Sequence, residues 1–139
     1  MDDTTGQQEN SLVQATVRGG CHCGAIEIEI DLPQQSIRPR RCNCSLCSTR
    51  NALMIGVPLA ALRVVRGKSS LNLYQWNTEV ARHYFCENCG VYTHHQRRSD
   101  PNEYAVNVSC LELDAHRLLP DIEYLDGAAN SLVNADDPP

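Results

Sequence analysis

Apolar and polar residues alternate with period two along most of this chain. The clearest case is residues 25–30, where isoleucines at every second position are separated by glutamates. Successive side chains of a strand point to opposite faces, so this pattern predicts a strand with one buried and one solvent-facing side. Similar patterns predict strands at residues 15–18, 52–57, 63–66, 71–76, 80–85, 91–95 and 104–108.

Turn-forming residues separate these segments, and helical patterns are scarce. Only residues 59–62 and about 114–119 favour short helical turns. Many short strands with frequent turns predict an all-β domain. Because the chain shows no internal repeat and no linker, residues 14–133 are expected to form a single domain. Residues 1–13 and 134–139 are expected to be disordered tails.

Eight cysteines, seven of them in three tight clusters, carry the main chemical signal. Thiolates one or two residues apart can converge on a single tetrahedral Zn²⁺ with Zn–S bonds of about 2.3 Å. Gly24 and Gly90 follow two of the clusters, where a tight metal-binding turn needs backbone freedom. The spacing therefore predicts a zinc protein. The clusters are Cys21 and Cys23; Cys42, Cys44 and Cys47; and Cys86 and Cys89, with Cys110 alone.

A disulfide framework is the competing interpretation of these cysteines. The first ten residues are acidic and polar, without the basic start and apolar core of an export signal. In a reducing compartment, clustered cysteines more often bind metals than form bridges. Neighbours such as Cys21 and Cys23 would also close a very small, strained ring. The sequence thus favours zinc sites and a cytoplasmic location.

The chain is acidic overall. Twelve Lys and Arg residues against 17 Asp and Glu residues give a formal net charge of −5. This balance argues against a nucleic-acid partner and against binding to anionic lipid. No apolar run approaches the ~20 residues of a membrane span. Basic residues gather locally at 38–41 and at Arg97 and Arg98, and the latter pair is expected on solvated surface.

The clustered cysteines divide into two sets. Cys21 and Cys23 follow the first expected strand, and Cys86 and Cys89 lie far along the chain where a strand meets a turn. A structural zinc commonly ties two such distant pairs together and contributes folding energy directly. The remaining cluster, in residues 42–47, offers three ligands and one open position. That arrangement is typical of a catalytic zinc.

Cys110 leaves several alternatives open. As a fourth ligand of the second zinc, Cys110 would close that site and make it structural. If it lies near the metal without binding it, this thiol would be a mobile ligand or a reactive group. A single unpaired cysteine is, however, most often a small buried hydrophobe.

Six segments of the chain, in order, resemble one known family. They are residues 19–26, 42–47, 73–78, 83–90, 98–101 and 107–111. Together they are similar to the glutathione-dependent formaldehyde-activating enzymes, a family that includes centromere protein V, and the stretch 73–110 is closer to that second branch. The resemblance implies an Mss4-like fold of complex β-sheets with two zinc sites. The structural site would use Cys21, Cys23, Cys86 and Cys89, and the second site Cys42, Cys44 and Cys47.

The resemblance also implies an activity. The family forms S-hydroxymethylglutathione from glutathione and formaldehyde, and its members are classed as carbon–sulfur lyases by the reverse reaction. Zinc bound by three thiolates is a weak Lewis acid, so we expect it to hold the glutathione thiol as thiolate rather than to activate the carbonyl strongly. Because glutathione is anionic, Arg40, Arg41 and Arg50, which flank the three-cysteine loop, are candidate contacts for this co-substrate.

For the histidines, the sequence favours packing or surface roles, and a general-base role is the alternative. His83 and Tyr84 are neighbours on one expected strand, so one of them faces the core. His94 and His95 are neighbours on another and therefore point to opposite faces, which keeps them out of one common site.

Three classes of function fit the sequence. We favour a zinc-dependent enzyme that acts on a thiol adduct, with glutathione and a small aldehyde as its substrates. A zinc-stabilised binding module is the second, and it differs in having no exchangeable ligand on the second zinc. A cytosolic thiol sensor is the third, in which oxidation of the loop cysteines releases zinc. The oligomeric state stays open.

Overall fold

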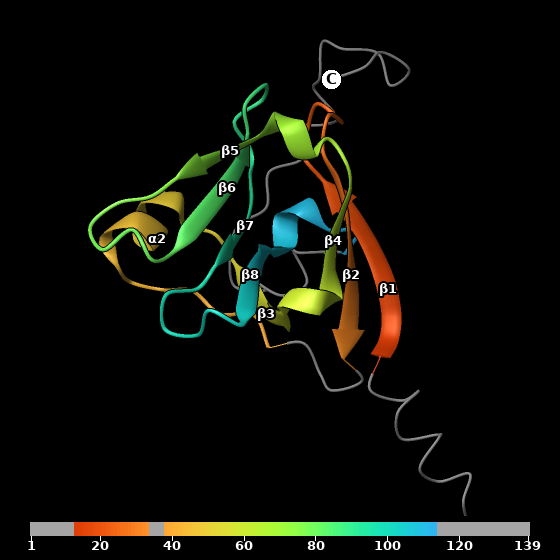
Figure 1. Ribbon diagram of the computed structural model, residues 1–139. Coiled ribbons are helices and arrows are strands. Elements are labelled where there is room, and N and C mark those ends of the chain that lie inside the picture. The colour runs from red at the N-terminus through yellow and green to blue at the C-terminus, as the bar shows by residue number, and fades with distance from the viewer. Residues whose placement is uncertain (1–12, 34–37, 114–139) are drawn as a thin grey trace, which may run out of the picture.

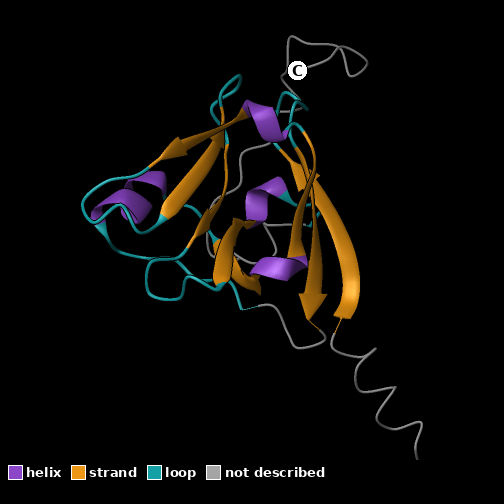
Figure 2. Ribbon diagram, viewed as in Figure 1, coloured by secondary structure: helices purple, strands orange, loops and turns teal. Residues whose placement is uncertain are grey.

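Two antiparallel β-sheets make up the part of the chain that the computed structural model describes, residues 13–33 and 38–113 (Figure 1). Figure 2 shows that strands dominate and that the helices are short. The prediction of an all-β fold is therefore confirmed. The smaller sheet has the order β1-β2-β4, with β1 Val13–Gly20, β2 Glu27–Pro33 and β4 Leu62–Arg66. The larger sheet has the order β3-β8-β7-β6-β5, with β3 Met54–Pro58, β8 Glu103–Asn107, β7 Tyr92–Gln96, β6 Arg82–Cys86 and β5 Leu71–Tyr74.

All eight strands expected from the hydrophobic pattern are present, with their ends displaced by one to a few residues. The helical turn expected at 59–62 is the 3₁₀ helix η1, Leu59–Ala61. The pattern does not predict α2, Ser45–Arg50, because none of its side chains is buried and it therefore lacks an apolar stripe. None of the helices in the described residues is long and apolar enough to cross a membrane.

Some expectations concern other parts of the chain. The turn at about 114–119, the tails at 1–13 and 134–139, and the end of the expected domain up to residue 133 all lie outside the described residues, apart from Val13 itself. Two further 3₁₀ turns complete the described elements: η2, Lys68–Ser70, and η3, Val108–Cys110.

Strand β2 shows how the alternating pattern builds the core. Ile28 and Ile30 are completely buried. On the opposite face, Glu29 pairs with Arg18 of β1 and Arg63 of β4, at N···O distances of 3.7 and 3.8 Å. Exposed ion pairs of this kind each contribute little to stability. The burial of the isoleucine face therefore holds this strand in place.

The hydrophobic core draws its members from both sheets and from the segment after β8. That segment returns to the smaller sheet, where Leu111 bridges Gly19 and the Glu112 amide donates to the Arg18 carbonyl at 2.8 Å. The return ties the two sheets together around one core. Its buried members are Ile26, Ile28, Ile30, Leu32, Leu53, Ile55, Val57, Leu62, Cys86, Val106, Val108 and Leu111.

The fold depends on the isoleucine face of β2, so we expect Ile28→Ala to destabilise the protein strongly. The lost methylene groups and the cavity left behind should lower the free energy of unfolding by about 2–5 kcal/mol. Val65→Ala is the matched control, because Val65 lies on β4 and is 47% exposed. That change should stay within about 0.5 kcal/mol. Urea unfolding with zinc present would measure both, and equal effects of the two changes would contradict this account of the core.

Candidate functional site

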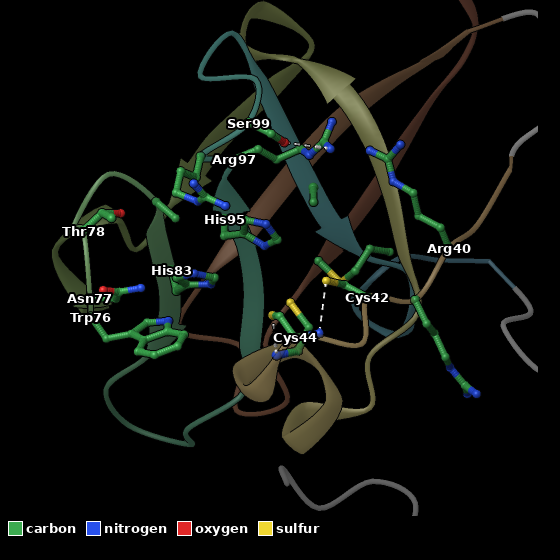
Figure 3. Close-up of a pocket in the computed structure, with 16 residues that line it drawn as sticks. Arg40, Cys42, Cys44, Trp76, Asn77, Thr78, His83, His95, Arg97 and Ser99 are labelled. Atoms are coloured by element: carbon green, nitrogen blue, oxygen red, sulfur yellow. Dashed lines mark hydrogen bonds between the residues drawn. The ribbon is translucent and has the colours of Figure 1, made fainter.

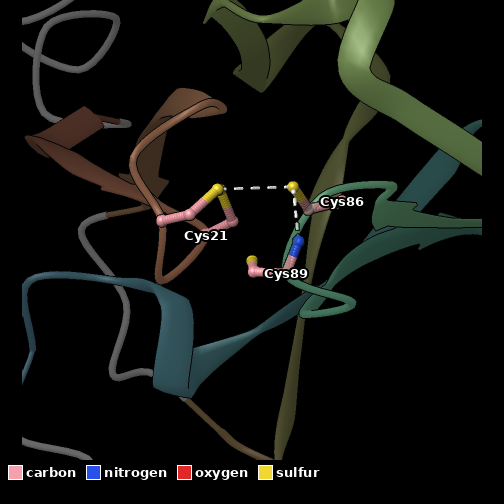
Figure 4. Close-up of side chains that lie close together, drawn as sticks. Cys21, Cys86 and Cys89 are labelled. Carbon is pink, nitrogen blue, oxygen red and sulfur yellow. Dashed lines mark hydrogen bonds between the residues drawn. The ribbon is translucent and has the colours of Figure 1, made fainter. Parts of the chain in front are cut away.

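The first cysteine group joins two turns that are far apart in sequence (Figure 4). The four sulfur atoms of Cys21, Cys23, Cys86 and Cys89 lie within 4.8 Å of one another. The distance from the Cys23 Sγ to the Cys21 Sγ is 3.6 Å, and to the Cys86 Sγ it is 3.7 Å. A tetrahedral zinc with bonds of about 2.3 Å holds its sulfurs roughly 3.8 Å apart. The group therefore has both the donors and the spacing to hold a metal ion.

Backbone amides point at these sulfurs, as expected for metal-binding turns. The Ile26 amide donates to the Cys21 Sγ at 3.2 Å, and the Asn88 amide donates to the Cys86 Sγ at 3.3 Å. Gly24 and Gly90, which follow the two pairs, have φ of 82° and 77°. This left-handed conformation favours glycine, so the sequence expectation for both positions is confirmed. Amides directed at sulfur stabilise the thiolate form that a metal requires.

The second cysteine group lies at the start of α2. The sulfurs of Cys42, Cys44 and Cys47 are within 4.8 Å of one another, and the first two residues are exposed. Cys44 is the N-cap of the helix, and its sulfur accepts from the Cys47 amide at 3.4 Å. Asn51, with φ of 52°, ends the helix, and its amide donates to the Cys47 carbonyl. This short helix is the reason that three neighbouring thiols converge.

The three thiols of the second group differ in acidity. The Cys47 amide lowers the pKa of the Cys44 thiol. Burial, reinforced by the neighbouring sulfurs of Cys44 and Cys42, raises the pKa of Cys47 to about 12. These three sulfurs could hold a metal ion with three ligands from the chain and leave one position for another ligand.

Cys110 is in neither group of sulfurs. Its side chain is buried and its thiol donates to the Tyr92 carbonyl at 3.3 Å. Burial raises the pKa of this thiol to about 12. Of the alternatives left open by the sequence, this placement fits the small buried residue and does not bring Cys110 into the second group as a fourth ligand.

The second group opens into a cleft with a volume of about 490 Å³ (Figure 3). That volume is in the range of sites for small molecules. The cysteines contribute one part of its lining, and the loop after β5, with Trp76, Asn77 and Thr78, contributes another. The lining residues are Arg40, Arg41, Cys42, Cys44, Cys47, Met54, Trp76, Asn77, Thr78, Ala81, His83, His95, Arg97, Arg98, Ser99 and Ala105.

Four arginines give the cleft a positive charge. The Oε1 atom of Glu103 accepts from Arg40 at 2.6 Å and from Arg97 at 2.9 Å, so one carboxylate is shared by two guanidinium groups. Arg41 and Arg98 have no ion-pair partner within the described ranges. Arg98 is exposed, as the sequence suggested, whereas Arg97 is half-buried against Glu103. What the sequence did not predict is that both line the cleft.

Arg50 takes a different place from the other candidate arginines. It is absent from the lining of the cleft. Its Nη1 atom lies 2.9 Å from the His83 Nδ1, and its guanidinium group stacks on the Tyr92 ring at 3.9 Å from the ring centre. The structure thus places Arg50 against two side chains of the larger sheet, whereas Arg40 and Arg41 line the cleft as the sequence suggested.

The histidines of β6 and β7 lie on opposite faces of the larger sheet. His83 and His95 are paired across the two strands, their rings stack at 4.5 Å, and both line the cleft. His94 is buried on the other face, where it stacks on Tyr84 at 4.9 Å and meets the edge of Tyr104 at 5.2 Å. The expectation that His94 and His95 point to opposite faces is confirmed.

Burial keeps all three histidines neutral at physiological pH. It lowers the pKa of His83 to about 4, with a further contribution from the charge of Arg50. It lowers the pKa of His94 to about 4 and that of His95 to about 3. Sequence reasoning expected packing or surface roles for these residues. A single sequence does not predict that the His83 and His95 rings stack inside a cleft, because the stacking depends on the register of two strands.

Two comparisons with known proteins agree with this architecture. The sequence profile described as glutathione-dependent formaldehyde-activating enzyme matches residues 16–125. The crystal structure of a Rhodobacter sphaeroides protein is similar to this chain, with a TM-score of 0.70 and 51% sequence identity. The similarity covers 76% of this chain and 96% of that one.

The two cysteine groups should differ in their effect on folding and metal content. Thiolate-only donor sets are typical of zinc, so we expect two zinc equivalents per chain. Cys44→Ser should remove one equivalent and leave the circular dichroism of the sheets unchanged. Cys86→Ser should remove the other and lower the free energy of unfolding by at least about 3 kcal/mol, because Cys86 is a completely buried member of the core. Elemental analysis would measure the zinc content, and urea unfolding would measure the stability. Two zinc equivalents in Cys44→Ser would contradict the assignment of the second group as a metal site.

The buried His94 should make stability depend on pH. Its pKa of about 4 lies below the ordinary value of 6.5, so the unfolded chain binds a proton more readily than the folded one. Its contribution to stability is therefore complete above pH 6.5 and falls as the pH is lowered towards 4. His94→Gln removes this contribution, so the loss of unfolding free energy between pH 7 and 5 should be smaller by roughly 1–2 kcal/mol than in the unmodified protein. Parallel pH curves for the two proteins would contradict this reasoning.

Proposed function

The chain belongs to the glutathione-dependent formaldehyde-activating enzyme family, and on this basis we propose that it is a zinc-dependent carbon–sulfur lyase. Its reaction is the formation or cleavage of S-hydroxymethylglutathione from glutathione and formaldehyde. The partners of this protein are thus a small thiol and a small aldehyde. The prevalence of free cysteines fits a reducing compartment, so we place the reaction in the cytoplasm.

One observation carries the proposal: the three-cysteine group opens into a cationic cleft of substrate size. Cys42 and Cys44 are exposed, and together with Cys47 they line the same cleft as the four arginines. A structural metal site has no need of such access, whereas a site for an anionic thiol needs both an open ligand position and positive charge.

The arginines of the cleft suit the shape of glutathione. This tripeptide carries a carboxylate at each end and its thiol in the middle. Arg41 lies beside the cysteine group in the chain, and Arg98 follows β7 on another segment of the lining. We assign the two carboxylates to these residues. Arg40 and Arg97 are less available, because both are already paired with Glu103. Guanidinium groups bind carboxylates well because they offer two parallel donors.

Zinc held by Cys42, Cys44 and Cys47 would supply a position at which the pKa of a fourth, thiol ligand is lowered. The chain's own residues then orient the substrates. Arg41 and Arg98 hold the ends of glutathione so that its sulfur faces the cysteine group. Trp76 and Met54 contribute apolar surface to the same cleft.

A thiol sensor is the second candidate, and the exposure of Cys42 and Cys44 favours it. Exposed thiols in a cluster are accessible to oxidants, and their oxidation would release a bound metal. The cationic lining distinguishes the two functions, because a sensor of small neutral oxidants needs no arginines. A non-catalytic binding module, as suggested by the likeness to the centromere protein V branch, would need no open ligand position either.

Exchange NMR of glutathione mixed with formaldehyde tests the enzymatic function. The zinc-loaded protein should accelerate the exchange between free glutathione and S-hydroxymethylglutathione by at least about tenfold over buffer. Cys44→Ser should return the exchange to the rate in buffer, because it removes a ligand from the open site and leaves the first cysteine group intact.

Cys110→Ser is the matched control for this experiment. It also replaces one sulfur by oxygen, but at a cysteine outside both groups, and serine can keep the bond to the Tyr92 carbonyl. This variant should exchange as fast as the unmodified protein and retain two zinc equivalents. No acceleration by the unmodified protein with both metals present would reject the proposed enzyme and favour the sensor or binding functions.

A further inference from the structure

Four side chains form a connected cluster at one side of the cleft, which we call the histidine cluster: Arg50, His83, Tyr92 and His95. The Arg50 guanidinium contacts both the His83 Nδ1 and the Tyr92 ring. The Tyr92 hydroxyl is hydrogen-bonded to the His95 Nδ1. The two imidazole rings stack on each other. Each member is therefore fixed by at least two others.

The contacts of this cluster determine where the imidazole protons lie. A guanidinium group can only donate, so the His83 Nδ1 must accept and its proton must be on Nε2. Burial raises the pKa of Tyr92, so its hydroxyl stays protonated and donates to the His95 Nδ1. A phenol is a far better donor than a neutral imidazole, which supports this direction of the bond. Both histidines thus carry their proton on Nε2.

The two Nε2 atoms belong to residues that line the cleft. Among the described residues neither atom has a hydrogen-bond partner, yet no buried side-chain nitrogen or oxygen there lacks one. Both residues line the cleft that contains the second cysteine group. Figure 3 shows the two rings between the Trp76 loop and the cysteines. Two N–H donors on stacked rings, without a partner among the described residues, indicate a site for an oxygen atom.

Resting on the proposed function, we propose that His83 and His95 are catalytic residues whose Nε2–H groups bind the oxygen of the aldehyde. Arg50 and Tyr92 are positioning residues, because they act only by holding the two rings. The cluster supplies what the cysteine group cannot, since three thiolates leave little positive charge with which to polarise a carbonyl.

The reaction balances with these roles. The glutathione sulfur, having lost its proton to solvent, forms a bond to the carbonyl carbon. The π electron pair of the C=O bond moves to oxygen, and the growing negative charge is stabilised by the two Nε2–H groups. The alkoxide then takes a proton from water and becomes the hydroxyl of S-hydroxymethylglutathione. The histidines donate hydrogen bonds throughout and keep their protons.

The neutral state of both rings fits this role. The burial of the rings, and to a smaller extent the nearby charge of Arg50, oppose protonation of His83 and His95. Each Nδ1 therefore keeps its acceptor role. A protonated His83 would lose its bond to Arg50. Because the donors are held in place before substrate arrives, little reorganisation is needed when charge develops on the oxygen.

The test compares His95→Phe with His95→Gln in the exchange experiment. Phenylalanine keeps a ring but has no donor, whereas glutamine places an N–H group close to the position of the imidazole Nε2. His95→Phe should slow the exchange by about 100-fold, and His95→Gln should retain a rate within about tenfold of the unmodified protein. His83→Phe should likewise slow the exchange more than His83→Gln does. This second pair replaces the first if a His95 variant does not fold.

Binding measurements separate a catalytic role from a structural one. Isothermal titration would compare S-hydroxymethylglutathione, formed in an equimolar mixture of glutathione and formaldehyde, with S-methylglutathione, which lacks the hydroxyl. His95→Phe should weaken binding of the first ligand by about tenfold and leave binding of the second unchanged. Equal loss for both ligands, or no loss for either, would overturn the proposal.

The outcomes also distinguish this inference from the function on which it rests. If the unmodified protein accelerates exchange and the phenylalanine variants do so equally well, the histidine assignment fails alone. If the unmodified protein does not accelerate exchange, the proposed function fails and the assignment fails with it. Nitrogen-15 NMR of the imidazoles gives a readout independent of activity: a proton on Nδ1 of either ring would also overturn the proposal.

Discussion

The convergence of four cysteines on one point is the constraint on which the rest of the structure depends. Cys21 and Cys23 lie in the turn between β1 and β2 of the smaller sheet. Cys86 ends β6 of the larger sheet, and Cys89 lies in the turn between β6 and β7. The group therefore sits where the two sheets meet. Because β6 and β7 lead from this junction to His83 and His95, the first cysteine group helps to position one wall of the cleft.

Charge is distributed unevenly over this acidic chain. The carboxylates of β2 are paired on the outer face of the smaller sheet, with arginines 18, 63 and 66. The cleft, by contrast, collects four arginines around a single carboxylate, that of Glu103. Because the described carboxylates of β2 are already paired with arginines, they do little to weaken the positive potential of the cleft. A net charge of −5 is thus compatible with a site for anions.

The sequence predicts those features that depend on local periodicity or spacing. The alternation in residues 25–30 predicts a half-buried strand, and the pairs of cysteines at short spacing predict sulfurs that converge. Both inferences need only the geometry of a few consecutive residues. The sequence does not predict α2, because its side chains are exposed and its stability comes from caps at Cys44 and Asn51. The orientation of Arg50 and the stacking of His83 on His95 depend on the register between β6 and β7, which no local pattern encodes.

The helix α2 makes assembly of the cleft cooperative. Its N-cap, Cys44, belongs to the cysteine group, and its last residue, Arg50, belongs to the histidine cluster. A helix of six residues is too short to persist in water without such end contacts. Unwinding it would therefore disperse the thiols and release the arginine in the same event. Order at either end of α2 therefore favours order at the other, which couples the two halves of the site.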